Sequence, residues 1–297
     1  MGSVFMKEQL QLIFAALLAL VLLPLAVTLI LSGWDSVSLE KEPDIEMYLV
    51  EIIYREMPEA YEGEAIKAQV VLARSTLKKG LKDGSVTQGD LERIASNLKE
   101  DMEKKEFLKS YETIQGYVTQ TRGEVLMYEN RVCEGSFHRV SGGATRDGAE
   151  VFGNDTYAYI TGVDSAMDME SPDYMKGHYF TPEELYDELK EKYPDSELDK
   201  EKMEDCIEIV SRDTQGYILE MKVGNVPCSG EEFRKVLNLN SSNFTFSKMG
   251  DEFRFLCRGV GHGLGMSQFG ANKLAQQGKD YKEILKYYFP KVEIIEG

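Results

Sequence analysis

A carboxylate interrupts the apolar stripe of a predicted helix near residue 56. The stripe has the spacing of one face of an α-helix, with apolar residues at Ile45, Tyr48, Leu49, Ile52 and Ile53. Glu56 occupies the next position of that face, and Pro58 is expected to end the helix. Desolvation raises the pKa of a carboxyl group, as a general acid working near neutral pH requires. Glu56 is therefore a candidate general acid/base. The alternative is a helix-end glutamate turned to solvent.

A second candidate, Glu64, lies in the first turn of the next predicted helix, which runs from Gly63 to a C-cap at Gly80. Its side chain falls on the far side from the apolar positions of that helix. A negative charge in a first turn interacts favourably with the helix dipole. A structural role is therefore a sufficient explanation for Glu64.

Five glycines lie within residues 259–270, between a predicted strand and a predicted helix. Glycines at this density permit positive φ and close approach of the backbone. His262 lies among them, and Ser267 and Gln268 stand at the start of the helix. The spacing matches neither a dinucleotide-binding fingerprint nor a phosphate-binding P-loop. The segment is either part of a ligand site or a tight structural turn.

A third motif runs from Ser136 to Thr145 and contains His138 and the pair Gly142-Gly143. Glycines flanked by hydroxyl side chains suggest a backbone that lies close to a ligand or to another segment, and ordinary turn chemistry is the alternative. A serine-hydrolase elbow is not indicated, because the segment around Ser267 lacks the required final glycine.

The elements expected around these motifs are helices mixed with antiparallel strands, an α+β fold. Residues 81–115 read as a charged, solvated helical insert without evident chemistry. Strands follow from Gly123, and a hairpin is expected over 207–224. A helix starts after Thr181 with Pro182 at its first position. The C-terminal segment reads as helix, helix, strand.

Composition excludes several classes of function. The chain has 297 residues and a net charge of −17, which argues against nucleic-acid binding. Its three histidines and the absence of a Cys-x-x-Cys pair argue against common zinc sites. The four cysteines allow three fully paired connectivities. One disulfide or more, or four buried thiols, are both compatible with the sequence.

Residues 12–31 are uncharged and long enough to span a bilayer as a helix. The sequence thus predicts a cytoplasmic tail at 1–11, a transmembrane helix at 12–31, a linker at 32–44 and a domain at 45–297 outside the cytoplasm. A cleaved signal peptide is the alternative for the apolar run.

Together, the Glu56-Met57-Pro58 motif, the helix EAIKAQVVLAR, the segment SFHRVSGGAT and the run GVGHGLGMSQFGANKLAQQGKDYKEILKYYFP resemble the stage II sporulation protein D family. That family also gives its name to a domain of amidase-enhancer proteins. The resemblance extends in order from about residue 46 to 295. It implies a membrane-anchored lytic transglycosylase of peptidoglycan, acting during engulfment in sporulation. A non-catalytic, glycan-binding amidase enhancer is the alternative.

The resemblance implies that Glu56 is the catalytic acid. Substrate binding is expected from the other polar residues and glycines of the motifs: Lys67, Gln69, Arg74, His138, Ser141, Gly142, Gly143, Thr145, His262, Gly263, Ser267 and Gln268. Some family members hold zinc in the loop matching 138–145. Ser141 and Ala144 replace two of those ligands here, so neither a metal nor another cofactor is expected. The implied partners are glycan strands stripped of stem peptides, a sporulation amidase and a membrane protein of the engulfment machinery.

Overall fold

The computed structural model describes residues 44–296, and all elements below belong to the unit Ile45–Gly297. Its α-helices are α2 (Glu46–Glu56), α3 (Gly63–Asp83), α4 (Gln88–Asp101), α5 (Lys105–Gln120), α6 (Gly148–Phe152), α7 (Pro182–Lys192), α8 (Gly230–Val236), α9 (Gln268–Gln276) and α10 (Tyr281–Tyr288). Short 3-10 helices are η2 (Asp155–Tyr157), η3 (Ala166–Glu170) and η4 (Lys200–Lys202).

The strands of this unit form four small sheets. Their bounds are β1 (Glu124–Tyr128), β2 (Arg131–Val132), β3 (Phe137–His138), β4 (Met175–Phe180), β5 (Ile207–Arg212), β6 (Ile218–Val223), β7 (Val226–Ser229), β8 (Phe244–Met249), β9 (Glu252–Arg258), β10 (Met266–Ser267) and β11 (Glu293–Glu296). The sheet orders are β11-β1-β2, β4-β9-β8 and β5-β6-β7, all antiparallel, and the pair β10-β3 is parallel. The mixture of helices and mainly antiparallel strands agrees with the α+β prediction.

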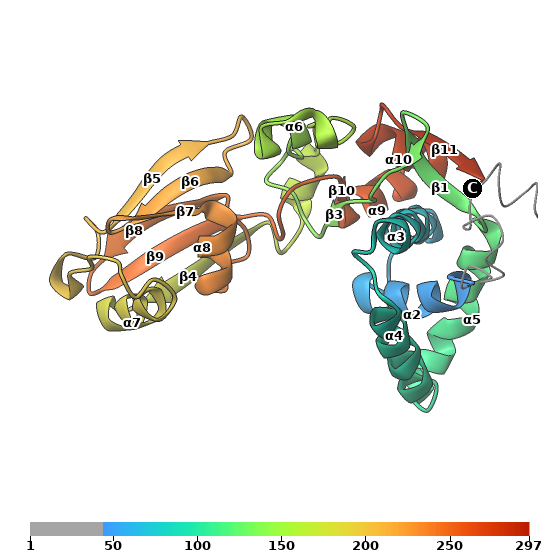
Figure 1. Ribbon diagram of the computed structural model, residues 1–297, viewed down its shortest axis with the longest axis horizontal. Coiled ribbons are helices and arrows are strands. Elements are labelled where there is room, and N and C mark those ends of the chain that lie inside the picture. The colour runs from blue at the N-terminus through green and yellow to red at the C-terminus, as the bar shows by residue number, and fades with distance from the viewer. Residues whose placement is uncertain (1–43, 297) are drawn as a thin grey trace, which may run out of the picture. The chain divides into compact units, whose positions relative to one another are not determined.

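One hydrophobic core holds the helical part together, and α3 lies at its centre. Helices α2, α5, α9 and α10 and strand β1 all contact α3, as Figure 1 shows. The predicted end of α3 at Gly80 is wrong. Gly80 packs so tightly that a Cβ there would lie 2.4 Å from Val86. The helix ends at Asp83 and is capped by Gly84, whose φ of +78° is the left-handed conformation that glycine adopts readily.

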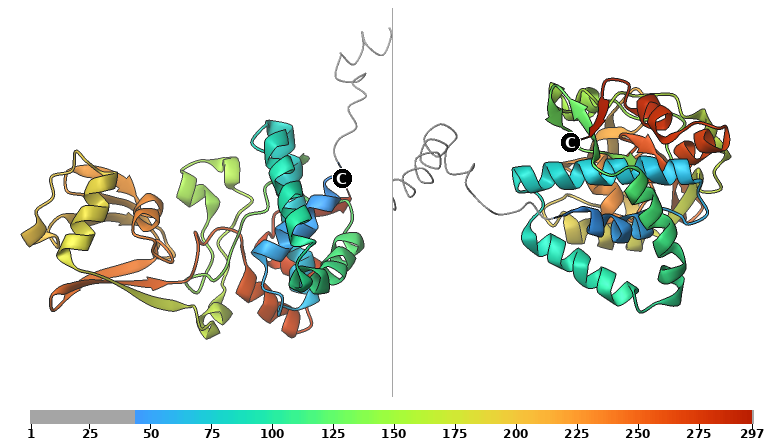
Figure 2. Two further views of the ribbon diagram at one scale, coloured as in Figure 1. Left: turned by 90° about the horizontal axis from the view of Figure 1, so that it is seen from below. Right: turned by 90° about the vertical axis from the view of Figure 1, so that its right-hand side faces the viewer.

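A second hydrophobic core lies between the sheets β4-β9-β8 and β5-β6-β7 and helices α7 and α8. The phenylalanines of β8 and β9 fill it; the rings of Phe244 and Phe255 meet edge to face at 5.5 Å. Helix α7 starts at the predicted position after Thr181, and the structure shows a capping box in which Thr181 and Glu184 bond reciprocally. The predicted hairpin forms from β5 and β6. In Figure 2, strands β4 and β9 run side by side from this part of the chain toward the helices.

The predicted transmembrane helix is not supported. No helix within residues 44–296 is long and apolar enough to cross a bilayer. The longest, α3, spans 21 residues but carries lysines and arginine between its apolar positions. Residues 12–31, on which the prediction rested, lie outside the described part. The membrane-helix component of the fold prediction and the single-pass membrane localisation built on it are therefore corrected.

The four cysteines are free thiols. Cys133 is buried in the first core and Cys257 in the second. Cys228 lies opposite Met221 on the neighbouring strand, not opposite Cys206. Of the two alternatives that the sequence left open, the described residues therefore agree with free thiols, which act as small apolar groups.

Candidate active site

The two glycine-rich motifs lie side by side because β3 pairs with β10. Phe137 is in register with Met266, and His138 with Ser267. The close approach explains one of the glycines. Gly265 has a φ of +72°, and a Cβ there would lie 2.0 Å from the carbonyl oxygen of Ser136. Any larger residue would push the two motifs apart.

Glu56 is the last residue of α2, and its side chain lines a cleft of about 460 Å³. The helix ends there because Pro58 keeps the residue before it, Met57, in an extended conformation. Helix α2 supplies one wall of the cleft, and α3 supplies another through Ala73, Thr76 and Leu77. The remaining walls come from α4, from residues 134–137 and from His262. The cleft thus joins the Glu56 motif to both glycine-rich motifs.

Two glutamines fix the position of Glu56. The Nε2 of Gln69, on α3, donates to Glu56 Oε2 at 3.2 Å. The Nε2 of Gln268, at the start of α9, donates to the backbone carbonyl of Glu56 at 3.1 Å. Both glutamine side chains are buried. The acid is therefore held from two separate helices.

The surroundings of the carboxyl group raise its pKa to about 7. Desolvation by the walls of the cleft is the main cause, and the hydrogen bond from Gln69 opposes it. The residue as a whole remains open to solvent. An acid in this position can keep its proton at neutral pH and still be reached by a substrate in the cleft.

Both glutamines also carry buried amide oxygens without a partner among the described residues, namely Gln69 Oε1 and Gln268 Oε1. Buried polar atoms without a partner are uncommon in folded proteins. A polar group of a ligand bound at this end of the cleft, beside Glu56, would supply the missing hydrogen-bond partners.

The two motif histidines are neighbours, with ring centroids 5.9 Å apart. His138 is buried, and its Nδ1 donates to the Leu264 carbonyl at 3.1 Å, which leaves Nε2 unprotonated and without a partner. His262 accepts from the Leu264 amide through its own Nδ1. Burial lowers both pKa values, that of His138 to about 3. Both rings are therefore neutral, and of the two, His262 lines the cleft.

Most hydroxyl residues of the motifs contact the protein itself. Asp168, which the sequence analysis missed, accepts from the Ser141 amide and from the hydroxyls of Ser165 and Ser267. Ser165 lies three positions before Asp168, whereas Ser141 and Ser267 come from distant segments that the local sequence does not reveal. Thr145 is buried and accepts from the Val163 amide. Gly142 donates to the Tyr217 hydroxyl, and Gly143 adopts a φ of +110°.

A buried ion pair supports the His262 loop and was also not predicted. Arg146 Nε lies 2.5 Å from Asp213 Oδ2, and both side chains are almost completely buried. Arg146 also donates to the His262 carbonyl at 3.0 Å and stacks on the Tyr217 ring. It thereby links the turn between β5 and β6 to the cleft. Gly263 allows this contact, since a Cβ there would lie 2.9 Å from Arg146 Cδ.

Three other candidates lie away from Glu56. Arg74 is fully buried and makes a bidentate ion pair with Glu46 at 2.7 and 2.8 Å, plus bonds to the end of α5 and the start of β1. Lys67 pairs with Glu64. Glu64 also accepts from the first amide of α10, that of Tyr281, at 3.0 Å. These contacts are structural.

Two further carboxylates line the cleft. Glu51 is buried and paired with Arg55, which also reaches Asp101 at 2.6 Å. Glu134 is partly exposed and lies 3.9 Å from Lys79. Ile94 and Asn97 of α4 complete the wall, so the charged insert contributes to the cleft, contrary to expectation. No cluster of His, Cys, Asp and Glu suited to a metal ion occurs within residues 44–296.

Comparison with known proteins places this site in a family. The family model described as stage II sporulation protein matches residues 35–128. Stage II sporulation protein D of Bacillus subtilis (strain 168) is 32% identical over 272 residues, covering 88% of this chain and 76% of that protein. The Bacillus amyloliquefaciens protein of the same name is 30% identical with the same coverage. The amidase enhancer of Bacillus subtilis is 25% identical over 80% of this chain and 39% of its own length. The chain therefore belongs to the stage II sporulation protein D family.

Proposed function

We propose that this protein is a lytic transglycosylase that cleaves the glycan strands of peptidoglycan during sporulation, with Glu56 as its single catalytic acid and base. One observation carries the proposal: a carboxyl group with a pKa of about 7 stands in an open cleft, held by two buried glutamines. The family membership and the amidase-enhancer relative support a cell-wall substrate.

The first step breaks the bond between C1 of N-acetylmuramic acid and the glycosidic oxygen. Protonated Glu56 donates its proton to that oxygen, and the leaving sugar departs as an alcohol. The carbonyl oxygen of the substrate's own N-acetyl group bonds to C1 and stabilises the positive charge that develops there. Glu56 is now a carboxylate, and Gln69 Nε2 hydrogen-bonds to it in this form.

The second step closes the 1,6-anhydro ring. The C6 hydroxyl attacks C1, the bond from the N-acetyl oxygen to C1 breaks, and Glu56 accepts the hydroxyl proton. The enzyme returns to its protonated state, and no water is consumed. One carboxyl group suffices, unlike the pair used by ordinary glycosidases. Glu51, the nearest carboxylate along α2, is engaged by Arg55.

The second candidate function is that of an amidase enhancer that binds glycan without cleaving it. The name of the 25% identical relative favours it. The raised pKa of Glu56 favours the enzyme, because glycan binding alone requires no carboxyl group that is protonated at neutral pH.

Replacement of the acid tests the proposal. Glu56→Gln keeps the size and most hydrogen bonds of the side chain but cannot donate a proton, so we expect the rate of glycan cleavage to fall about 10³-fold. Glu64→Gln is the matched control, and we expect it to retain activity. Cleavage of purified glycan strands is measured by chromatography of the anhydro products. A thermal melt of each variant shows that it is folded. A folded Glu56→Gln variant that still releases anhydro ends at the wild-type rate would rule out this role.

A further inference from the structure

The sheet β4-β9-β8 has one buried and one open face. Alternate residues such as Phe255 and Phe244 enter the second core. The other residues point to solvent; Tyr179 is 55% exposed and Met175 is 49% exposed. The open face therefore displays two large side chains, one near each end of β4.

Two arginines lie on β9, the central strand of this sheet. Arg258 of β9 is opposite Met175, and Arg254 is opposite Tyr179. Leu256 lies between them, with Gly177 on one side and Thr245 on the other. Two residues four positions apart on a strand are separated by about 13 Å. We call the surface formed by Met175, Tyr179, Thr245, Arg254, Leu256 and Arg258 the arginine face.

Neither the Arg254 nor the Arg258 side chain has an ion-pair or hydrogen-bond partner within residues 44–296, and Arg254 Nε is buried without one. Several exposed cations elsewhere are paired, as in Lys279–Glu283 and Lys104–Glu100. A further arginine, Arg212, donates to the Phe244 carbonyl of β8. The pKa of Arg212 is lowered by burial and then by the charge of Arg258, which places the two cations near each other. Glu252, at the hairpin end of β9, is the acidic residue of this face.

Strand β9 leads directly into the cleft. Arg258 is its last residue, and His262, which lines the cleft, follows four positions later. The turn between them is fixed by hydrogen bonds from Gly259 to the Tyr174 carbonyl and from Val260 to the Val140 carbonyl. The arginine face is thus built on the same strand that delivers a cleft residue.

We propose that the arginine face binds the part of the glycan strand that extends beyond the cleft, through the carboxylates of N-acetylmuramic acid residues that carry no stem peptide. This inference rests on the proposed function. A glycan stripped of its peptides has a free lactyl carboxylate on each muramic acid, so it is a polyanion. A protein with a net charge of −17 repels a polyanion on average. Binding therefore requires unpaired cations, and the arginine fork suits a carboxylate. The Tyr179 ring offers an apolar surface and a hydroxyl group to the sugars that lie between the carboxylates.

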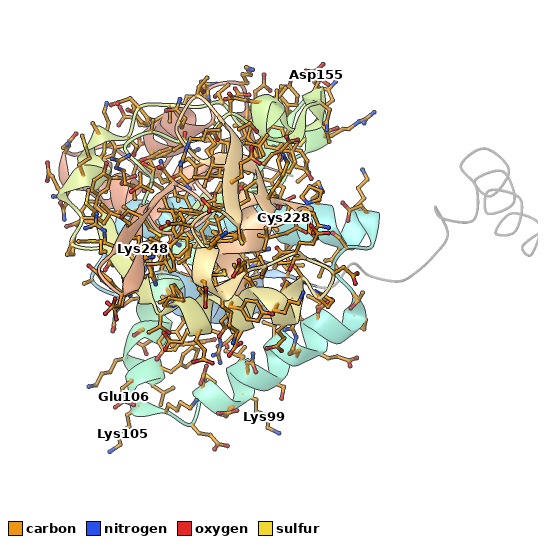
Figure 3. The ribbon with its side chains drawn as sticks, turned by 90° about the vertical axis from the view of Figure 1, so that its left-hand side faces the viewer. Lys99, Lys105, Glu106, Asp155, Cys228 and Lys248 are labelled. Atoms are coloured by element: carbon orange, nitrogen blue, oxygen red, sulfur yellow. The ribbon has the colours of Figure 1, made fainter. Side chains whose placement is uncertain are left out.

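Binding is tested in the Glu56→Gln background, so that the strand is not consumed. Arg254→Glu/Arg258→Glu reverses both charges. Lys99→Glu/Lys105→Glu is the matched control, since it changes the net charge equally on the insert helices, where Figure 3 shows both lysines. The probes are insoluble amidase-treated glycan, the same glycan with its carboxyl groups reduced to alcohols, and chitin as an uncharged polymer.

We expect the double arginine variant to bind amidase-treated glycan at least tenfold more weakly at low salt, whereas the lysine control binds as the parent does. The parent should prefer the carboxylate-bearing glycan over both uncharged polymers, and added salt should reduce this preference. Arg254→Lys/Arg258→Lys keeps the charges and should retain most of the binding. A thermal melt excludes loss of fold as the cause.

Unchanged glycan binding by the folded glutamate variant would overturn the inference, as would equal binding to carboxylate-bearing and carboxyl-reduced strands. Sedimentation that reveals self-association lost in this variant, with glycan binding unchanged, would reassign the face to a second copy of the chain. These outcomes do not depend on catalysis. Failure of the proposed function would appear instead as undiminished cleavage by the Glu56→Gln protein.

Discussion

The cleft and the arginine face place their charged groups in opposite environments. In the cleft, protein walls desolvate Glu56 and raise its pKa to about 7. On the arginine face, Arg258 remains in solvent and without a partner. The comparison teaches that one chain can use desolvation by the walls of a cleft to tune a single proton and exposure to display fixed charge. Salt should affect the second region far more than the first, because buried groups are screened much less.

Loss of the ion pair that joins the β5–β6 turn to the cleft should have the largest effect. Arg146→Met removes the partner of Asp213, which is buried. An unpaired buried carboxylate costs about 3–5 kcal/mol, so we expect the free energy of unfolding to fall by that amount. Denaturant titration of the variant measures it. The double change Arg146→Met/Asp213→Leu should recover part of the loss. If Arg146→Met alone unfolded at the same denaturant concentration as the wild type, this role of the ion pair would be contradicted.

Removal of an amide beside the acid should disturb the cleft without unfolding it. Gln69→Leu deletes the hydrogen bond to the Glu56 carboxylate. We expect about a 10²-fold lower kcat, because the acid is no longer oriented and its charged form is less stable after the first step. The pH dependence of the residual rate should shift upward, which a purely structural role would not produce. Gln69→Glu is not a suitable control, since it adds a second carboxylate.

The pH profile should separate the cleft from the arginine face. Because the acid must be protonated, kcat/KM should fall about tenfold per pH unit above pH 7. Glycan binding by the arginine face should change little from pH 6 to 9, since arginine stays charged throughout. The cleavage rate and the glycan binding are measured across this pH range on the same glycan preparation. A rate that rises through pH 7 would mean that Glu56 acts first as a base.

The raised pKa of Glu56 also predicts a smaller effect, on the stability of the protein. The folded pKa of Glu56 lies above the ordinary value of 4.5, so the folded state holds a proton that the unfolded state releases between about pH 4.5 and 7. Stability therefore falls as the pH rises through this window. Glu56→Gln should stabilise the protein at pH 8 by no more than about 1 kcal/mol, because solvent screens an exposed group, and should have no such effect at pH 4. Paired thermal melts at the two pH values provide the check.

Local patterns predicted the elements that carry the site. The apolar stripe and Pro58 set the end of α2, and Thr181 with Pro182 set the start of α7. Each signal lies within a few residues of the element it defines. The role of Glu64 was also readable, because a first-turn glutamate has a structural use; its bond to the Tyr281 amide is of that kind.

The partners of the site could not be predicted, because they come from distant segments. Asp168 contacts the sheet pair β3-β10 only after the chain has folded, and Asp213 meets Arg146 across 67 positions. The motifs also predicted that Arg74 binds the substrate, whereas its guanidinium group is paired with Glu46. Sequence spacing shows which residues share a helix face. It does not show which buried group completes their hydrogen bonds.

The fate of water during cleavage tests the central claim most directly. Amidase-treated glycan is digested by the wild-type protein in water enriched in heavy oxygen, and the new ends are analysed by mass spectrometry. If Glu56 alone serves as acid and base, the new muramic acid ends are 1,6-anhydro and contain no label. Labelled reducing ends would contradict the account and would indicate hydrolysis, with a second cleft carboxylate such as Glu134 activating the water.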